Sequence, residues 1–239
     1  MTFIARKRGY ALGMNRDEKL SRLTGRPPNK KILDGHVIIS PSEPGGGTWI
    51  ALNDCRVSYA LINWYSITTR VVDNAVSRGE VVNSVSAAIS PDVADIALQR
   101  LPLYRINPFR LVGIFPATSE IVEWRWNLQK LIRKVHHWNT QQWISSGFNE
   151  RTAQRVRGKT FQQALDQRSA GGMDWLRRLH RSHLPQSGPF STCMHRADAA
   201  TVSYTEIIVL PRTATMRYHA GPPCAAKQAH AEIFNSLLQ

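Results

Sequence analysis

The chain has 239 residues, of which 42% are hydrophobic and 20% charged, as in one globular domain with a substantial core. No apolar run approaches the ~18 residues of a membrane span, and the run after the basic residues at 6–8 is too short for a signal peptide. We therefore expect a cytoplasmic protein without a membrane span. The net charge of +14 would suit nucleic acid or an anionic ligand. Because the basic residues are scattered and no nucleic-acid-binding motif is visible, we do not expect a nucleic-acid binder.

The first sixty residues have the pattern of a β-meander. Two short apolar runs, 2–5 and 10–14, flank a turn at 7–9 and predict a β-hairpin. Its second strand delivers Asn15, Arg16 and Asp17 close to the start of the chain. Further strands are predicted at 36–40, 48–52 and 56–63.

The rest of the chain alternates between groups of helices and groups of strands. Helical spacing of apolar residues predicts helices at 77–89, 91–101, 149–167, 173–180 and 225–238. Extended segments are predicted at 110–115, 120–126, 136–145, 201–210 and 213–219. Such grouping is typical of an α+β or layered fold. Since no repeat or linker is visible, we expect a single domain over residues 1–239.

The cysteines and glycines favour structural roles. Cys55, Cys193 and Cys224 are an odd number without metal-ligand spacing, as expected of reduced thiols. Cys193 and His195 are two residues apart and could form a metal pair, but the spacing supplies no further ligands. We therefore expect no metal and no cofactor. The glycines at 45–47 precede a strand and lack the Lys-Ser/Thr of a phosphate-binding loop, which favours a tight turn.

A carboxylate and a guanidinium held beside a chain terminus suit an enzyme whose own α-amine is the general base. Asp17 and Arg16 are the candidates. Each also has a structural interpretation: Asp17 could close the hairpin, and Arg16 could pair with Glu18 or another carboxylate.

Four blocks in the first third of the chain resemble one known family. They are Asn15-Arg16-Asp17-Glu18, Gly46-Gly47-Thr48-Trp49-Ile50-Ala51-Leu52-Asn53, Tyr59-Ala60-Leu61-Ile62-Asn63 and Ser77-Arg78-Gly79-Glu80-Val81-Val82. In this order they resemble the NRDE family, also called the transport and Golgi organisation protein 2 family. That family is related to the N-terminal-nucleophile hydrolases of the choloylglycine and penicillin V acylase kind.

The resemblance implies a four-layer αββα sandwich of two antiparallel sheets and hydrolysis of linear amides by an N-terminal nucleophile. It assigns Asp17 to holding the terminal amine and Asn63 to donating to the oxyanion. Asn15 stands where those hydrolases also carry asparagine, whereas Arg16 is offset from their arginine. A second oxyanion asparagine has no counterpart, and the nearest stretch, 143–147, offers the Ser146 hydroxyl and backbone amides instead.

The chain departs from the family at its start, where members typically begin Met-Cys and this chain begins Met1-Thr2. Thr2 is small enough for Met1 to be removed, and a terminal threonine can be a nucleophile. Hairpin geometry opposes this role: with the turn centred between Lys7 and Arg8, the residue opposite Asp17 falls about two places before Met1. We therefore expect a few native residues, including the cysteine, to precede Met1, with Thr2 as the alternative nucleophile.

The remaining candidates would line a binding pocket. Trp49 and Trp64 would form its walls, and His195 and Arg196 could face it, although a core histidine and a surface arginine are the structural alternatives. Two functions stay open: a hydrolase of a linear amide or related acyl compound, and a non-catalytic carrier of the same fold for haem or a lipid-like acyl ligand. The sequence does not set the oligomeric state.

Overall fold

The computed structural model describes residues 1–225 and 229–235. Two compact units contain these residues: the first comprises Met1–Gly25 and the described part of Asn139–Gln239, and the second is Arg26–Trp138. Each unit has one antiparallel sheet and two of the four described α-helices. The predicted α+β class with two antiparallel sheets is therefore confirmed.

The sheet of the first unit has the strand order β10-β1-β2-β11-β12-β13. Its strands are β1 (Thr2–Arg6), β2 (Gly9–Lys19), β10 (Gln141–Gln142), β11 (Ala199–Val209), β12 (Thr213–Ala220) and β13 (His230–Asn235). The predicted hairpin is confirmed, because β1 and β2 pair Thr2 with Gly13 and Arg6 with Gly9 around a turn at Lys7 and Arg8. Gly9 has φ +106°, and a Cβ there would lie 2.1 Å from the carbonyl oxygen of Val209, so only glycine fits.

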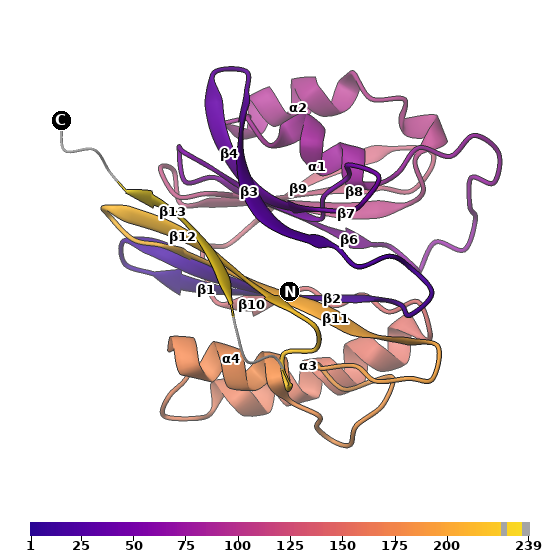
Figure 1. Cartoon of the computed structure of the whole chain (residues 1–239), viewed down its shortest axis with the longest axis vertical. Helices are drawn as coiled ribbons and strands as arrows, with labels where there is room; N and C mark the ends of the chain where they lie inside the picture. The colour runs from indigo at the N-terminus through magenta and orange to yellow at the C-terminus, as the bar shows by residue number, and fades with distance from the viewer. Residues whose placement is uncertain (226–228, 236–239) are drawn as a thin grey trace. The chain divides into compact units, whose positions relative to one another are not determined.

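Helices α3 (Glu150–Leu165) and α4 (Met173–Arg181) pack on one face of this sheet (Figure 1). The Asn149 side chain caps α3 by accepting a hydrogen bond from the Thr152 amide, 2.9 Å away. The apolar faces of both helices meet alternate side chains of β1 and β2 in a cluster of Ile4, Ala11, Phe161, Ala164, Trp175, Leu176 and Leu179. Side chains at even positions of β1 and odd positions of β2 therefore face the helices.

The sheet of the second unit has the strand order β3-β4-β5-β6-β7-β8-β9. Its strands are β3 (Arg26–Leu33), β4 (His36–Ser42), β5 (Ile50–Asn53), β6 (Ser58–Asn63), β7 (Phe109–Phe115), β8 (Glu120–Trp126) and β9 (Leu131–His136). All five central strands had been predicted. The edge strands β3 and β9 had not, and the predicted extended segment 136–145 contains only the short β10 beyond the end of β9.

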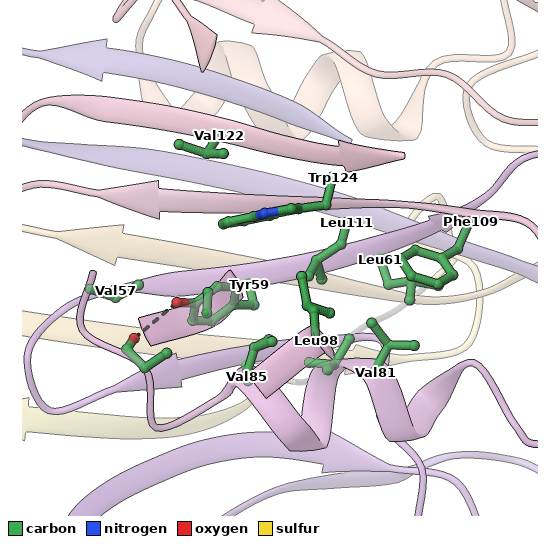
Figure 2. Close-up of a cluster of buried hydrophobic side chains, with 14 of the residues drawn as sticks. Val57, Tyr59, Leu61, Val81, Val85, Leu98, Phe109, Leu111, Val122 and Trp124 are labelled. Carbon is green, nitrogen blue, oxygen red and sulfur yellow. Dashed lines mark hydrogen bonds between the residues drawn. The ribbon is translucent and has the colours of Figure 1, made fainter. Parts of the chain in front are cut away.

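Helices α1 (Gly79–Val85) and α2 (Pro91–Gln99) and the 3₁₀ turn η1 (Leu103–Arg105) complete this unit. Figure 2 shows Tyr59, Leu61 and Leu111 of the sheet packing toward Val81, Val85 and Leu98 of the two helices. The Tyr59 hydroxyl donates to the Ala88 carbonyl at 2.9 Å, so the one polar group of this ring is satisfied in the core.

The glycines at 45–47 form the predicted tight turn. The Glu43 amide donates to the Gly47 carbonyl at 2.7 Å, and the Gly46 amide donates to the Glu43 carbonyl at 2.9 Å. Gly46 has φ +88°, a conformation that favours glycine.

The predicted helix 225–238 is wrong for its described part. Residues 230–235 form β13, which pairs antiparallel with β12 from His230 opposite Tyr218 to Asn235 opposite Thr213. Pairing with β12 supplies the backbone hydrogen bonds of this segment and overrides its local helical preference. Residues 226–228 and 236–239 of the predicted helix lie outside the described residues.

Candidate functional site

The segment that resembled the NRDE motif lies on β2, between β1 and β11. Asn15 and Asp17 face the helices, where they contact His180 of α4 and Arg157 of α3. Arg16 lies between them in the strand and points to the opposite face of the sheet. It is buried and pairs with Glu18 at 3.5 Å, the structural alternative expected for it. The motif thus places Asn15 and Asp17 on one face of the sheet and Arg16 and Glu18 on the other.

Asn15 links α4 and the following loop to the sheet. Its Nδ2 donates to the backbone carbonyls of His180, at 3.0 Å, and Thr192, at 2.8 Å. Its Oδ1 lies 3.0 Å from His180 Nδ1. Because Oδ1 can only accept, Nδ1 of His180 carries a proton in this arrangement.

The other ring nitrogen of His180 faces Thr2. His180 Nε2 lies 3.1 Å from Thr2 Oγ1 and, with the proton on Nδ1, accepts a hydrogen bond from that hydroxyl. Thr2 is 0% exposed and His180 1% exposed. Burial, together with the charges of the chain's terminal ammonium and Arg157, lowers the pKa of His180 well below its ordinary value. The imidazole is therefore neutral near pH 7.

Asp17 is held by a different set of partners. Arg157 pairs with Asp17 Oδ2 at 3.2 Å, and the Thr201 hydroxyl donates to Oδ1 at 2.6 Å. The Asp17 side chain stays 23% exposed. Gly13 of β2 is opposite Thr2, and Asp17 lies four residues beyond Gly13. At ~3.3 Å per residue, Asp17 is therefore about 13 Å along the strand from the position opposite Thr2.

The start of the chain is fixed in the sheet by backbone hydrogen bonds. The ammonium of Met1 donates to the Trp143 carbonyl at 3.0 Å, and the Trp143 amide donates to the Met1 carbonyl at 2.9 Å.

Ser146, the predicted substitute for an oxyanion asparagine, accepts a hydrogen bond from the Phe148 amide at 3.3 Å.

His195 and Arg196 lie in the loop before β11. Arg196 pairs with Asp198 at 2.7 Å and stacks over the Phe148 ring, 4.5 Å from its centroid. His195 lies among three other potential metal ligands: His183, Cys193 and Cys224. Burial is the main cause that raises the pKa of Cys193 to about 12, so this thiol is not a ready nucleophile near pH 7.

The other predicted residues, Asn63, Trp49 and Trp64, belong to the second unit. Asn63 ends β6, and its Nδ2 donates to the Tyr65 hydroxyl at 2.9 Å. Trp49 is buried just before β5, whereas Trp64 is half-buried and its amide donates to the Pro108 carbonyl at 3.2 Å.

The sequence pattern did not point to His180, Arg157 or Thr201 as site residues. His180 and Arg157 were each part of a correctly predicted helix, and Thr201 of a correctly predicted strand, but nothing in their spacing connected them to Asn15 or Asp17. The contacts span from 140 to 184 residues of chain.

Comparison with known families gives the context of this site. The model of the family described as Transport and Golgi organisation 2 matches residues 2–170. The chain belongs to this family. The family expected from the four sequence blocks is therefore confirmed. No curated protein matches the chain by sequence.

Solved structures resemble the chain in fold. Penicillin V acylase from Agrobacterium tumefaciens matches with a TM-score of 0.54 and 10% identity over 98% of this chain and 84% of its own. Two variants of conjugated bile acid hydrolase from Clostridium perfringens match with TM-scores of 0.51 and 0.52 and 10% identity, over 100% of this chain and 97% of theirs. The fold expected from the resemblance, that of the N-terminal-nucleophile hydrolases, is thereby confirmed. Among the described residues, no helix combines the length and apolar character needed to cross a membrane.

Proposed function

We propose that this family member hydrolyses a linear amide or related acyl compound, with Thr2 as its nucleophile and His180 as its general base. The observation that carries the proposal is the hydrogen-bonded series from Thr2 Oγ1 to His180 Nε2, at 3.1 Å, and from His180 Nδ1 to Asn15 Oδ1, at 3.0 Å. A hydroxyl, a base within hydrogen-bond reach and a third group that orients the base are the elements of nucleophilic catalysis. A fold shared with an acylase and a bile acid hydrolase supports the same reaction class.

In the proposed reaction, Thr2 Oγ1 attacks the substrate carbonyl carbon while its proton passes to His180 Nε2. The C–N bond then breaks, and His180 returns this proton to the leaving amine, which leaves an ester on Thr2. Water attacks the ester with His180 again as base, and the acid and the free Thr2 hydroxyl are released. A neutral imidazole is needed at the first step, and the lowered pKa of His180 provides it.

Asn15 and Arg157 would act through His180. The Asn15 amide fixes the tautomer that leaves Nε2 free to accept the Thr2 proton. The charge of Arg157 disfavours protonation of His180, which keeps Nε2 in the form that can accept this proton. Asp17, which pairs with Arg157 at 3.2 Å, would position that guanidinium rather than the terminal amine.

One observation bears against catalysis by Thr2 and leaves the second candidate function, a non-catalytic carrier of an acyl ligand or haem, to be tested. Thr2 is 0% exposed, so a substrate carbon reaches Oγ1 only if the chain covering it moves. A buried Thr2–His180 contact could instead serve solely to hold α4 on the sheet.

The two functions are separated by activity and covalent labelling of the full chain. Acyl p-nitroanilides and p-nitrophenyl acyl esters serve as substrates, and a fluorophosphonate serves as the probe, with its site mapped by mass spectrometry. Thr2→Val should abolish labelling and lower turnover by at least about 10³-fold, as loss of a nucleophile does, whereas Thr2→Ser should keep both. Thr205→Val is the matched control, since Thr205 is also a fully buried threonine of this sheet.

Turnover that persists in Thr2→Val, or a probe adduct on another residue, would show that Thr2 is not the nucleophile. Absence of both turnover and labelling, with tight binding of fatty acyl-coenzyme A or haem in a titration, would establish the carrier function instead.

A further inference from the structure

Two histidines and two cysteines from separate segments meet in the first unit. His183, Cys193 and His195 lie in the chain between α4 and β11, and Cys224 lies in the turn after β12. Each offers one ligand atom, and the four atoms all lie within 4.8 Å of one another. His195 Nε2 is 3.2 Å from His183 Nε2 and 3.5 Å from each of the sulfur atoms of Cys193 and Cys224.

These distances match the edges of a tetrahedral zinc site. With Zn–N bonds of about 2.05 Å and Zn–S bonds of about 2.3 Å, ideal tetrahedral angles place two nitrogens ~3.3 Å apart and a nitrogen and a sulfur ~3.6 Å apart. The observed separations of 3.2 Å and 3.5 Å agree with both values. Two thiolates and two imidazoles are also a donor set typical of zinc in tetrahedral geometry.

We propose that His183, Cys193, His195 and Cys224 bind one zinc ion. Because four protein side chains complete a tetrahedron and leave no position for water or substrate, the site would be structural rather than catalytic. On binding, the two thiols give up their protons to solvent and the two imidazoles bind in their neutral forms. This inference stands independently of the hydrolase proposal.

Backbone hydrogen bonds already hold the ligand-bearing segments in place. The Cys193 amide donates to the Ser182 carbonyl at 2.9 Å, and the His195 amide donates to the Gly188 carbonyl at 3.2 Å. Near Cys224, the Gly221 amide donates to the Val202 carbonyl of β11 at 2.9 Å. A metal ion would therefore join two segments that are each anchored separately, and little further ordering would be needed to bind it.

The zinc site would also support Asp17. Met194, between two of the ligands, donates its amide to the Thr201 hydroxyl at 2.8 Å, and this hydroxyl donates to Asp17 Oδ1 at 2.6 Å. A metal that fixes Cys193 and His195 would thus fix the hydrogen bond that orients the Asp17 carboxylate.

The test is a titration of the reduced, chelator-treated full chain with Co²⁺, followed by displacement with Zn²⁺. We expect one Co²⁺ per chain, the visible bands of tetrahedral cobalt and near-ultraviolet thiolate-to-cobalt charge transfer, all lost when Zn²⁺ is added. Cys193→Ser and Cys224→Ser should each remove about half of the charge-transfer intensity, and His195→Ala should weaken binding by at least tenfold.

Cys55→Ser is the matched control, because Cys55 is the other cysteine of the chain and lies in the second unit. Its spectrum should equal that of the unmodified chain, with folding of every variant checked by circular dichroism. The proposal is wrong if the unmodified chain shows no tetrahedral cobalt spectrum, or if the charge transfer is lost in Cys55→Ser. It is also wrong if Cys193 and Cys224 form a disulfide and the chain still takes up no metal once this bond is reduced.

Discussion

The hydroxyl of Thr2 lies 3.1 Å from His180 Nε2, although 178 residues separate the two in the chain. This contact joins β1 to the last turn of α4, and Asn15 of β2 extends it on the other side of the imidazole at 3.0 Å. The polar series crosses the layer between sheet and helix beside the apolar cluster around Trp175 and Leu179. This series can therefore hold the helix on the sheet, act in catalysis or do both.

His180 should make the free energy of unfolding fall in mild acid. The pKa of the folded-state imidazole is depressed well below 6.5, first by burial, so below pH 6.5 the unfolded chain binds a proton that the folded chain does not. The stability that the folded chain gains from keeping His180 neutral is complete above pH 6.5. It is lost as the pH falls toward the pKa of the folded state, by at most about 1.4 kcal/mol per pH unit. Urea unfolding between pH 8 and pH 5 measures it.

His180→Gln is the comparison for that experiment. Glutamine can still accept a hydrogen bond from Thr2 but does not titrate. Below pH 6.5 the slope of the unfolding free energy against pH should therefore decrease by the equivalent of up to one bound proton. The proposed hydrolysis should be lost at every pH. An unchanged slope in this variant would mean that His180 keeps an ordinary pKa in the folded chain.

Gly13→Ala should disturb the same contact. A Cβ at Gly13 would lie 3.0 Å from His180 Cδ2 and Nε2 and 3.1 Å from the Tyr204 hydroxyl, closer than side chains pack without shifting. We expect a destabilisation of about 1–3 kcal/mol and a slower acylation of Thr2, because the imidazole moves away from Oγ1. Thermal unfolding and probe labelling measure the two effects.

Gly158→Ala is its control. Gly158 lies inside α3, and a Cβ there meets nothing within 4 Å, so alanine should stabilise the chain by up to about 1 kcal/mol. Equal effects of both substitutions would show that the space beside His180 is not restricted.

The sequence predicted the elements whose pattern is local. The hairpin centred on Lys7 and Arg8 was predictable from two apolar runs, and β7 and β8 from alternation around a turn. The edge strands β3 and β9 were missed because their side chains are mostly exposed and lack alternation, and β3 contains two prolines. β13 was mistaken for a helix because its only strand signal is the partner β12.

In the candidate site, too, the residues with a local sequence signal were predicted and those that depend on long-range contacts were not. The motif at 15–17 identified Asn15 and Asp17, which do contact the helices. Their partners could not be predicted, since long-range pairing alone brings them together. Of the proposed zinc ligands, Cys193 and His195 were noted as a possible pair because they are two residues apart. His183 and Cys224 were missed, since they lie 12 and 29 residues from His195.

In the second unit, Glu123 should be essential to stability. It is fully buried and contacts Arg110 at 2.5 Å, Arg125 at 2.7 Å and His136 at 2.8 Å. Burial alone would raise the pKa of Glu123, but its hydrogen bonds to His136 and Arg125 and the charge of Arg110 together hold it well below the ordinary value. The stabilisation is present above pH 4.5 and is lost as the pH falls below it.

Glu123→Gln would leave the two arginines without their carboxylate. Because Arg110 is 13% and Arg125 29% exposed, water would lessen the penalty below the ~3–5 kcal/mol of a fully buried pair, to about 2–3 kcal/mol at pH 7. Glu120→Gln on the same strand should change stability by less than about 0.5 kcal/mol. Similar values for the two variants in chemical unfolding would contradict this role of Glu123.

Gly79→Ala should be among the most damaging small substitutions in the second unit. Gly79 begins α1, and its added Cβ would lie 2.7 Å from Gly47 Cα and 2.9 Å from the Thr48 amide nitrogen. Both are backbone atoms, so no side-chain rotation relieves the clash, and α1 or the turn before β5 must shift. We expect a loss of about 1–3 kcal/mol in the free energy of unfolding, measured by thermal unfolding.

Gly45→Ala in the turn before β5 is the control. The added Cβ meets nothing within 4 Å, so this substitution should be nearly neutral. A comparable loss of stability in Gly45→Ala would assign the effect to the turn's flexibility rather than to the close approach of Gly79 and Gly47.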